Sequence, residues 1–363
     1  MFNKIFDFLF RKKPSVTPPK PINKQKILFI VKQRIIPDYD NKGGGATSTG
    51  LLTSAKMVVN LLSTFPNVDV NIVEVIDNND IDREVTKYKP DIVIIEALWV
   101  IPEKFDILKK LHPKVKWVVR LHSDLPFLAL EGVSFDWIPE YIKRGIFVAS
   151  NSSRLHTELS YLYDKKFLTY LPNYYPLDPF KLKKIEPFKM IVNIGSFGAV
   201  RPMKNQLIQA VSAIRFAEMN GQVVHFHING SRCEGRGDSV LRNLRSLFRS
   251  MPRHKLIEHP WYSHEDFKKM LSSTIDISMQ VSLSETYNIV TADSINQGIP
   301  VVVSSEIPWV AKCYQADPNS SCDIIEKLQA AYYDGLNKKH KINYANLVEF
   351  NASVSDVWSK FLK

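Results

Sequence analysis

Residues 190–205 read MIVNIGSFGAVRPMKN, a short apolar run that passes through two glycines to a pair of cations. The run over 190–195 has the length and composition of a buried parallel strand, and the pattern predicts a helix over 205–218. Arg201 and Lys204 would then lie in a loop at the carboxyl end of the strand. A planar guanidinium and a compact ammonium three residues apart suit the two phosphates of a pyrophosphate group.

Short apolar runs alternate with helical periodicity along the rest of the chain. The runs predicted as strands are 26–31, 70–75, 91–96, 117–121 and 146–149 before this stretch, and 223–228, 275–279 and 300–303 after it. Such alternation is typical of doubly wound sheets. We therefore expect an α/β protein with two Rossmann-like, doubly wound domains that face each other across an interdomain cleft.

Changes in composition set the expected domain boundaries. Residues 1–25 combine an apolar and basic peptide with a proline-rich linker. Residues 26–175 and 186–345 are expected to form the two domains, and residues 346–363 a C-terminal helix. A connection rich in proline and lysine separates the domains.

Length and composition exclude several classes of protein. The chain has 363 residues, of which 45% are hydrophobic and 23% charged, as in soluble globular proteins. No apolar run reaches the ~20 residues of a membrane-spanning helix. Three scattered cysteines cannot build a disulfide framework or a zinc knuckle. We expect a cytoplasmic protein with no metal site.

The net charge of +11 is concentrated in two segments. Residues 1–26 carry seven basic side chains and one acidic one, and residues 231–255 carry seven and two. Two basic patches on an otherwise neutral chain favour a polyanionic partner, either nucleic acid or an anionic membrane surface. Two solvated faces would give the same composition.

A pair of carboxylates follows in the second half, in the segment SETYNIVTAD over 284–293. Glu285 is expected in a loop and Asp293 on the helix that follows it. Such a pair can hold the hydroxyls of a sugar and of a ribose, while amides at the start of the helix face phosphate oxygens. Tyr287, Asn288 and Ile289 lie between them, at the expected start of the helix.

The first half carries a glycine-rich loop between a strand and a helix, with Gly44 and Gly45 at its centre. Glycines there let the backbone approach a phosphate at the helix N-terminus. The loop lacks the Gly-Lys-Ser/Thr ending of a nucleotide-hydrolysing P-loop and the spacing of a dinucleotide fingerprint. It is therefore a candidate donor contact, and a plain strand-to-helix turn is nearly as good an explanation.

The N-terminus is strongly apolar over residues 1–10 and ends in three basic residues. Its charges follow the apolar run, which is the reverse of a signal peptide. The segment could anchor the chain at a membrane interface, dock into a groove of a partner, or be a mobile end.

These motifs together resemble the retaining GT-B glycosyltransferases of family four and the related T-even phage DNA α-glucosyltransferases. That family carries a Glu-x7-Glu pair, here Glu285 and Asp293, and an Arg/Lys pair for the donor pyrophosphate, here Arg201 and Lys204. A histidine-bearing loop in its first domain corresponds to residues 120–124. The second acid is shorter than in the family, and Asn288 stands where the family often has glycine.

The resemblance implies a fold, a reaction and a set of roles. The fold would be GT-B, with an N-terminal acceptor domain and a C-terminal nucleotide-sugar domain. Arg201 and Lys204 would neutralise the leaving diphosphate, so that neither a cofactor nor an obligatory metal is needed beside the nucleotide-diphosphate sugar. Further roles would fall to Glu285 on the sugar hydroxyls, His122 lining the sugar pocket, Asp293 on the ribose and Asp124 as base toward the acceptor.

Two further features point to DNA as the acceptor. Arg242, Arg245 and Arg249 are spaced to share one face of a helix that could follow a phosphate backbone. The segment Phe6-Asp7-Phe8-Leu9-Phe10 is similar to the peptides with which T-even phage proteins dock onto their sliding clamp. The preferred hypothesis is a bacteriophage enzyme that glycosylates a hydroxymethylated pyrimidine, such as 5-hydroxymethylcytosine, in duplex DNA.

Two alternatives stay open. The first is an envelope or lipopolysaccharide glycosyltransferase held at the membrane by residues 1–13. The second is a non-catalytic DNA- or clamp-binding protein on the same fold.

Overall fold

The computed structural model describes residues 24–33, 50–179, 182–183, 185–186 and 189–363. The predicted docking peptide, Phe6 to Phe10, and the predicted donor contacts Gly44 and Gly45 lie outside these residues. In the part of the chain that the structure describes, no helix has the length and hydrophobicity that a transbilayer span requires.

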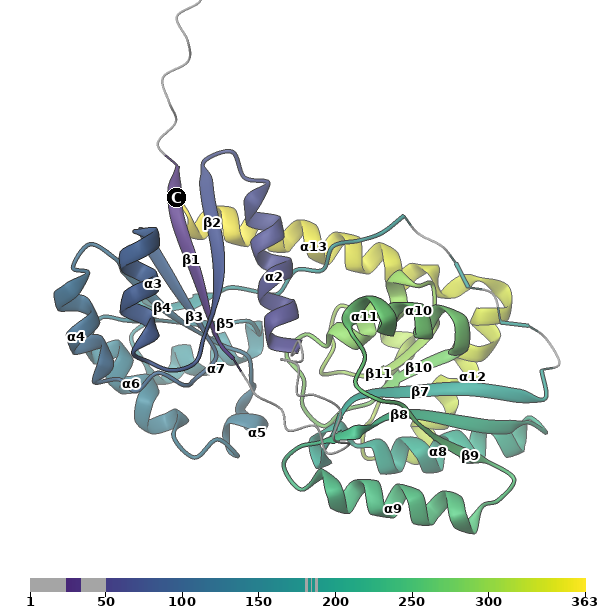
Figure 1. The fold of residues 1–363 in the computed structure, drawn as a ribbon. Coiled ribbons are helices and arrows are strands. Elements are labelled where there is room, and N and C mark those ends of the chain that lie inside the picture. Colours follow the sequence, from purple (N-terminus) through teal and green to yellow (C-terminus); the bar gives the residue numbers. More distant parts are fainter. Residues whose placement is uncertain (1–23, 34–49, 180–181, 184, 187–188) are drawn as a thin grey trace, which may run out of the picture.

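The first half folds into a parallel sheet with the strand order β2-β1-β3-β4-β5-β6 (Figure 1). Its strands are β1 (Gln25–Lys32), β2 (Val68–Val75), β3 (Ile92–Glu96), β4 (Lys116–Leu121), β5 (Phe147–Ser150) and β6 (Leu168–Tyr170). Its helices are α2 (Gly50–Ser63), α3 (Asp80–Tyr88), α4 (Lys104–Leu111), α5 (Leu125–Leu128), α6 (Ser134–Lys143) and α7 (Ser153–Leu162), and a 3-10 turn, η1, covers Lys165–Phe167. Because helices cover both faces, the central strands are apolar along their length rather than alternating.

The second half repeats this architecture with the order β12-β11-β10-β7-β8-β9. Its strands are β7 (Ile191–Val200), β8 (Val223–Cys233), β9 (Lys255–Glu258), β10 (Ile277–Gln280), β11 (Val301–Ser304) and β12 (Gln315–Ala316). Its helices are α8 (Gln206–Met219), α9 (Gly237–Ser250), α10 (His264–Thr274), α11 (Ile289–Asn296), α12 (Ser321–Asn337) and α13 (Ile342–Phe361). Short 3-10 turns are η2 (Pro202–Lys204), η3 (Lys312–Tyr314) and η4 (Lys339–Lys341). The expected α/β class with two doubly wound units is confirmed.

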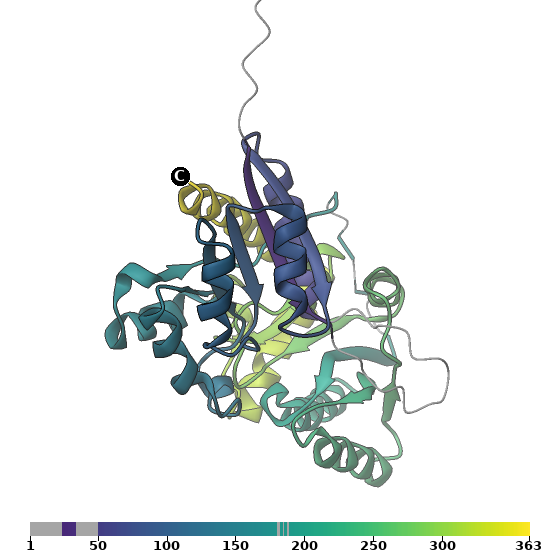
Figure 2. The same cartoon turned by 60° about the vertical axis from the view of Figure 1, so that its left-hand side comes forward.

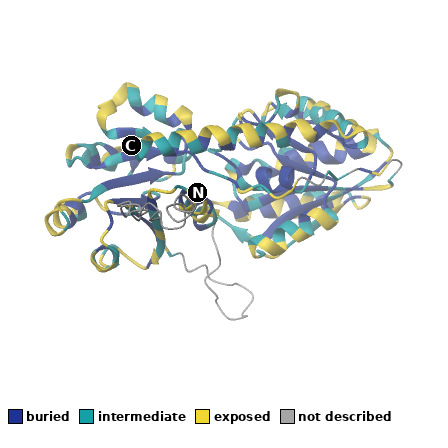
Figure 3. Ribbon diagram, turned by 90° about the horizontal axis from the view of Figure 1, so that it is seen from above, coloured by how far each residue is buried: buried dark blue, intermediate teal, exposed yellow. Residues whose placement is uncertain are grey.

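Burial follows the two layers of strands, which lie in the dark blue interior of each half while the outer faces of the helices are exposed (Figure 3). The two units lie side by side, joined by the connection after β6 and by α13 (Figures 1 and 2).

The prediction for the segment after 195 needs a correction. Residues 196–200 were expected in a loop, but β7 continues through them to Val200, and β8 likewise passes residues 229 and 230. The pairing slips between Gly195 and Val200, so the extension is an irregular, bulged one. Gly195 allows this bulged conformation because the Phe197 ring lies directly over it. A Cβ at this position would stand 2.3 Å from that ring.

Helix α13 belongs to both halves of the molecule. It packs against α11 in the second unit and ends against the first sheet, where Trp358 is fully buried (Figure 1). The Trp358 indole donates a hydrogen bond to the Pro172 carbonyl at 3.0 Å, and its ring centroid lies 6.0 Å from that of Phe29. The last helix thus stabilises the first domain, although it follows the second in sequence.

Candidate active site

The carboxyl ends of the parallel strands of both sheets face a cleft between the two units. We define the cleft by five residues that line it, His122, Ser123, Arg201, Lys204 and Glu285. The first two come from the loop after β4, the next two from the turn after β7, and Glu285 from the loop after β10. Ligands bind at such edges in open α/β sheets because strand-end loops and helix N-termini converge there.

Lys204 and Glu285 form an ion pair in the cleft, with Nζ 2.5 Å from Oε1. Both side chains are about one-tenth exposed. Burial disfavours the Glu285 anion, but Lys204 and Arg201 outweigh it and hold the pKa of Glu285 below its ordinary value. Lys204, which was predicted to bind phosphate, and Glu285, which was predicted to bind the sugar, are therefore paired with each other in the structure.

The backbone around Lys204 fixes this pair. Turn η2 carries Lys204 at its end, and the Lys204 carbonyl accepts a hydrogen bond from the Gln209 side chain at 2.7 Å. Gly198 has a φ of +105°, and a Cβ there would stand 3.2 Å from Cε of Lys204. Glycine at 198 therefore suits the backbone conformation, and any larger residue would require the Lys204 side chain to shift.

Arg201 reaches the same cleft by a different route. Its guanidinium lies 4.8 Å from the ring centroid of Phe127, and its Nη1 is 3.5 Å from Oε2 of Glu234. Its Nε is buried without a hydrogen-bond partner among the described residues. An aromatic face and one carboxylate orient the guanidinium, and Arg201 lines the cleft.

His122 is held by partners that the sequence did not predict. Its Nε2 contacts the buried carboxylate of Glu96, and its Nδ1 lies 3.3 Å from Nδ2 of Asn151. Burial lowers the pKa of His122, so the ring is neutral. Because Glu96 can only accept, Nε2 carries the proton and Nδ1 accepts from Asn151. Both ring nitrogens are thus engaged by the protein.

Glu96 also pairs with Arg120, whose Nη1 lies 3.1 Å from each of its carboxylate oxygens. Both side chains are fully buried. Burial opposes the Glu96 anion, but Arg120 and His122 lower its pKa nonetheless. The Arg120 Nε donates to the Leu171 carbonyl at 2.8 Å, so this charge pair also fixes the connection between the domains.

Asp124 lies beside the cleft and contacts the second unit through Arg154. The Asp124 carboxylate is 2.7 Å from Arg154 Nη2, and the same nitrogen is 2.6 Å from Glu306 in the second unit. Burial raises the pKa of Asp124 despite this partner. Its Oδ1 is buried without a hydrogen bond to the described residues. Arg154 thus links the loop that carries Ser123 and Asp124 to the second domain.

The start of α11 faces the cleft, as predicted. Asn288 has a φ of +65°, the left-handed conformation that asparagine tolerates, and its Oδ1 accepts from the Thr291 amide at 2.9 Å. Ile289 follows at the first helical position and lines the cleft. The Tyr287 ring instead packs in the core against Trp309 and Phe350, so a donor contact there would come from its main chain.

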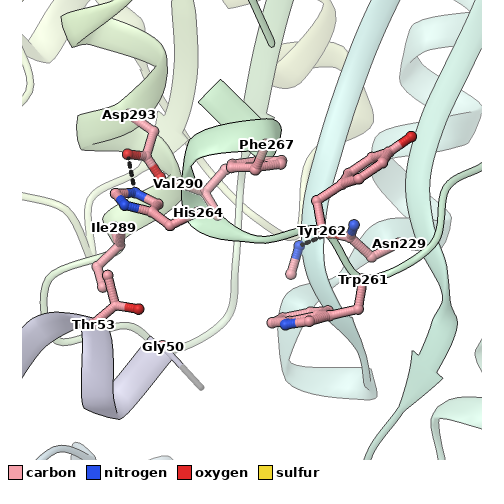
Figure 4. A pocket seen from close by; sticks show the side chains of 11 residues that line it. Gly50, Thr53, Asn229, Trp261, Tyr262, His264, Phe267, Ile289, Val290 and Asp293 are labelled. Carbon is pink, nitrogen blue, oxygen red and sulfur yellow. Dashed lines mark hydrogen bonds and ion pairs between the residues drawn. The ribbon is translucent and has the colours of Figure 1, made fainter. Parts of the chain in front are cut away.

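Asp293 lies deeper than expected, at the wall of a pocket that adjoins the cleft (Figure 4). Its side chain is 1% exposed. Its Oδ1 accepts from the Tyr175 hydroxyl at 2.6 Å and is 2.7 Å from Nε2 of His264. Its predicted contact with a ribose stays a prediction.

The three predicted nucleic-acid ligands are brought together on α9 as expected. Arg242, Arg245 and Arg249 are all exposed. Arg245 is paired with Glu258, with two contacts of 2.7 Å, which leaves its charge partly compensated. Arg232, which was not singled out, lines the cleft, and its guanidinium lies 4.2 Å from the ring centroid of Trp261.

The most informative missed residues are Glu96, Arg154 and His264. Glu96 could have been found, because a carboxylate at the end of an apolar strand in a parallel sheet lies at the ligand-binding edge. Arg154 and His264 are ordinary surface residues by sequence pattern. Only the approach of the two domains, and of α10 to α11, gives them their partners.

No protein-family model and no curated protein sequence matches the chain. Solved structures are similar throughout its length. The N-terminal domain of trehalose-6-phosphate phosphatase from Candida albicans matches with a TM-score of 0.63 and 10% identity, covering 95% of this chain and 97% of that one. HepE from Anabaena, in complex with UDP and glucose, matches with a TM-score of 0.62 and 14% identity over 92% and 99%.

A glycosyltransferase from Rickettsia africae matches with a TM-score of 0.60 and 12% identity, over 94% of this chain and 99% of that one. Together with the two parallel sheets, these similarities identify the fold as GT-B, the fold of nucleotide-sugar glycosyltransferases. The similarity to phage DNA glucosyltransferases stays a prediction.

Proposed function

We propose that this protein is a nucleotide-sugar glycosyltransferase. The observation that carries the proposal is the convergence of Arg201, Lys204 and Glu285 at one point of the interdomain cleft. Two cations and one carboxylate are what a diphosphate and a sugar hydroxyl require as neighbours. They lie at the strand ends of a fold that is shared with proteins solved in complex with UDP.

The donor would replace the ion pair between Lys204 and Glu285. Lys204 would move from the carboxylate to a phosphate oxygen, which frees Glu285 to accept from hydroxyls of the sugar. The Arg201 guanidinium, which lies over the Phe127 ring, would contact the same diphosphate. As the sugar–phosphate bond breaks, negative charge grows on the diphosphate, and two preorganised cations stabilise it without requiring a metal.

We further propose that transfer proceeds with retention of configuration, as in the family that the motifs resemble. His122 is neutral with both ring nitrogens engaged, so it serves as a fixed wall of the sugar pocket rather than as an acid or base. Asp124 is the group suited to take the proton of the acceptor hydroxyl. Asp124 lines the same pocket as His122 and Glu285, but its carboxylate is 2% exposed and paired with Arg154, so this pair must open before the carboxylate can accept the proton.

For the acceptor we propose duplex DNA that carries a hydroxymethylated pyrimidine. Arg232 lines the cleft at the end of β8, and Arg242 and Arg249 are exposed on α9, the helix that follows β8 in the chain. A flipped base would enter the cleft while the arginines hold the adjacent backbone. The resemblance of residues 6–10 to clamp-docking peptides supports the same acceptor, since docking would place the enzyme on newly made DNA.

The test is a transfer assay with the full chain. Nucleotide sugars with UDP, GDP, ADP and dTDP are combined with duplexes containing 5-hydroxymethylcytosine, 5-hydroxymethyluracil or only ordinary bases. We expect one hexose or pentose mass on a hydroxymethylated nucleoside, with the anomer of the donor. Transfer to lipopolysaccharide in vesicles, with none to DNA, would instead identify an envelope enzyme.

The α9 surface has a charge-matched control. Changing Arg242 and Arg249 to Gln should weaken DNA binding and flatten its dependence on salt concentration, because about two phosphate contacts are lost. Changing Lys110 and Lys143 to Gln removes the same charge from exposed positions on α4 and α6. Equal losses from both pairs would show that α9 is not the DNA-binding face.

A further inference from the structure

The strongest observation outside the proposed phosphate and sugar contacts is a dyad of His264 and Asp293. His264 is the first residue of α10, after the cap Ser263, and Asp293 lies in α11. The 2.7 Å contact between His264 Nε2 and Asp293 Oδ1 joins the two helices at the wall of the adjoining pocket (Figure 4).

This pocket is continuous with the cleft. Gly50, Gly198, Trp261, Ile289 and Val290 line both. A diphosphate held by Arg201 and Lys204 at the turn after β7 would therefore direct the rest of the nucleotide into it. Trp261 and Tyr262 lie across the pocket from His264, and they offer aromatic surface (Figure 4).

The carboxylate itself is poorly placed for a ligand. The Asp293 side chain is 1% exposed, and one of its oxygens already accepts from both Tyr175 and His264. His264, by contrast, is 25% exposed and lines the pocket. Its second ring nitrogen, Nδ1, makes no hydrogen bond to the described residues.

Building on the proposed function, we infer that His264 is the residue that binds a ribose hydroxyl of the donor nucleotide, and that Asp293 is the positioning residue that holds its ring. Since Nε2 donates to the carboxylate, Nδ1 faces a ligand as an acceptor in the neutral ring and as a donor in the cation. A hydroxyl can bond to either form, but the bond donated by the charged ring is the stronger one, so the preference for the ribonucleotide should rise as pH falls through the pKa of His264. A deoxyribose lacking that hydroxyl can bond to neither form.

Removal of the hydroxyl tests this directly. Binding of UDP, GDP and ADP, and of their 2′-deoxy and 3′-deoxy forms, is measured by calorimetry on the wild type and on variants of the full chain. For the nucleotide that binds, we expect one deoxy form to bind about tenfold more weakly than the ribonucleotide. His264→Ala should lower that ratio to about one, and His264→Asn should keep part of it.

The variant His156→Ala, at a half-buried position on α7 that lines neither the pocket nor the cleft, should retain the full ratio. Asp293→Asn should reduce the ratio and shift its pH dependence to lower pH, because Asp293 raises the pKa of His264 against the effect of burial, with smaller effects from Lys268 and Glu265. A purely structural role of Asp293 would lower stability without moving the pH profile.

Two outcomes would overturn the inference. If the wild type binds a ribonucleotide and His264→Ala keeps the full preference over the deoxy form, the ribose is held elsewhere. If the wild type binds a ribonucleotide without any preference, the inference alone fails. Absence of binding by any nucleoside diphosphate would contradict the proposed function as well, so the two failures are distinguishable.

Discussion

At the scale of single residues, two buried ion pairs position the side chains of the cleft. Lys204–Glu285 lies at the cleft and Glu96–Arg120 lies behind it. A buried pair adds little net stability, but loss of one partner leaves the other charged and without compensation. For either pair, a variant that removes one partner should therefore be less stable than the variant that removes both.

Lys204→Met should lower the free energy of unfolding by about 3–5 kcal/mol, because it strands the Glu285 carboxylate. The double variant Lys204→Met with Glu285→Gln should recover most of that stability and remain inactive in sugar transfer. Chemical denaturation and donor turnover measured on the same samples separate the two effects. Recovery of activity in the double variant would show that the pair is structural only.

The Glu96–Arg120 pair predicts a pH dependence of stability. Arg120 and His122 hold the pKa of Glu96 below its ordinary value, so the anion stabilises the fold above that value, and the contribution is lost as pH falls through the folded-state pKa. The melting temperature of Glu96→Gln should lie well below that of the wild type from about pH 5 upward. The difference should shrink toward pH 3, and a constant difference would contradict the assignment.

At the scale of elements, the turn after β7 determines the geometry of the cleft. Gly198→Ala should displace Lys204, since the new Cβ would stand 3.2 Å from its Cε at a φ of +105°. Gly132 is a matched control, because it has a φ of +66° with nothing within 4 Å of the added atom. Both variants should lose roughly 1 kcal/mol of stability from backbone strain.

Only Gly198→Ala should also weaken binding of the donor, by tenfold or more. Calorimetric titration of the nucleotide into both variants measures this. A matching loss in Gly132→Ala would assign the effect to global destabilisation instead.

Elements differ in how well the sequence predicts them. Apart from the carboxyl ends of β7 and β8, which extend well beyond their predicted ends, the predicted strands agree with the observed ones to within two residues, because burial on both faces requires a continuous apolar run. Strands β6, β9 and β12 were missed, and each is a strand of two to four residues at a sheet edge. The extension of β7 was also missed, because Gly195 and Gly198 are typical of a loop unless the Phe197 ring is known to cover the first of them.

In the candidate site, too, features set by local sequence could be predicted, whereas contacts between distant elements could not. Arg201 and Lys204 could be assigned to one loop, and Glu285 and Asn288 to another, because the spacing within each segment is local; their roles stay predictions. The contact of His264 with Asp293 could not be predicted, since nothing within α10 indicates that Asp293 of α11 lies beside it. Side chains that are paired across elements are visible only after folding.

At the scale of the whole molecule, α13 joins the two units. Trp358→Ala should destabilise the protein by about 3–5 kcal/mol, because it removes a fully buried indole from beneath the first sheet. Val348→Ala on the same helix is a control, since Val348 is 45% exposed and should cost less than about 0.5 kcal/mol.

Hydrogen exchange should then show greater amide exposure in β1 and β3 of Trp358→Ala, and little change in β7 and β10. Equal loss of protection in both sheets would mean that the two units unfold as one.

The central claim is that the cleft binds and activates a nucleotide-diphosphate sugar. The most direct measurement is the release of nucleoside diphosphate from a panel of nucleotide sugars by the wild type, Arg201→Gln and the surface variant Lys110→Gln. The account predicts release from one class of donor, a loss of about hundredfold or more in Arg201→Gln, and no change in Lys110→Gln. No release from any donor, or wild-type rates in Arg201→Gln, would contradict it.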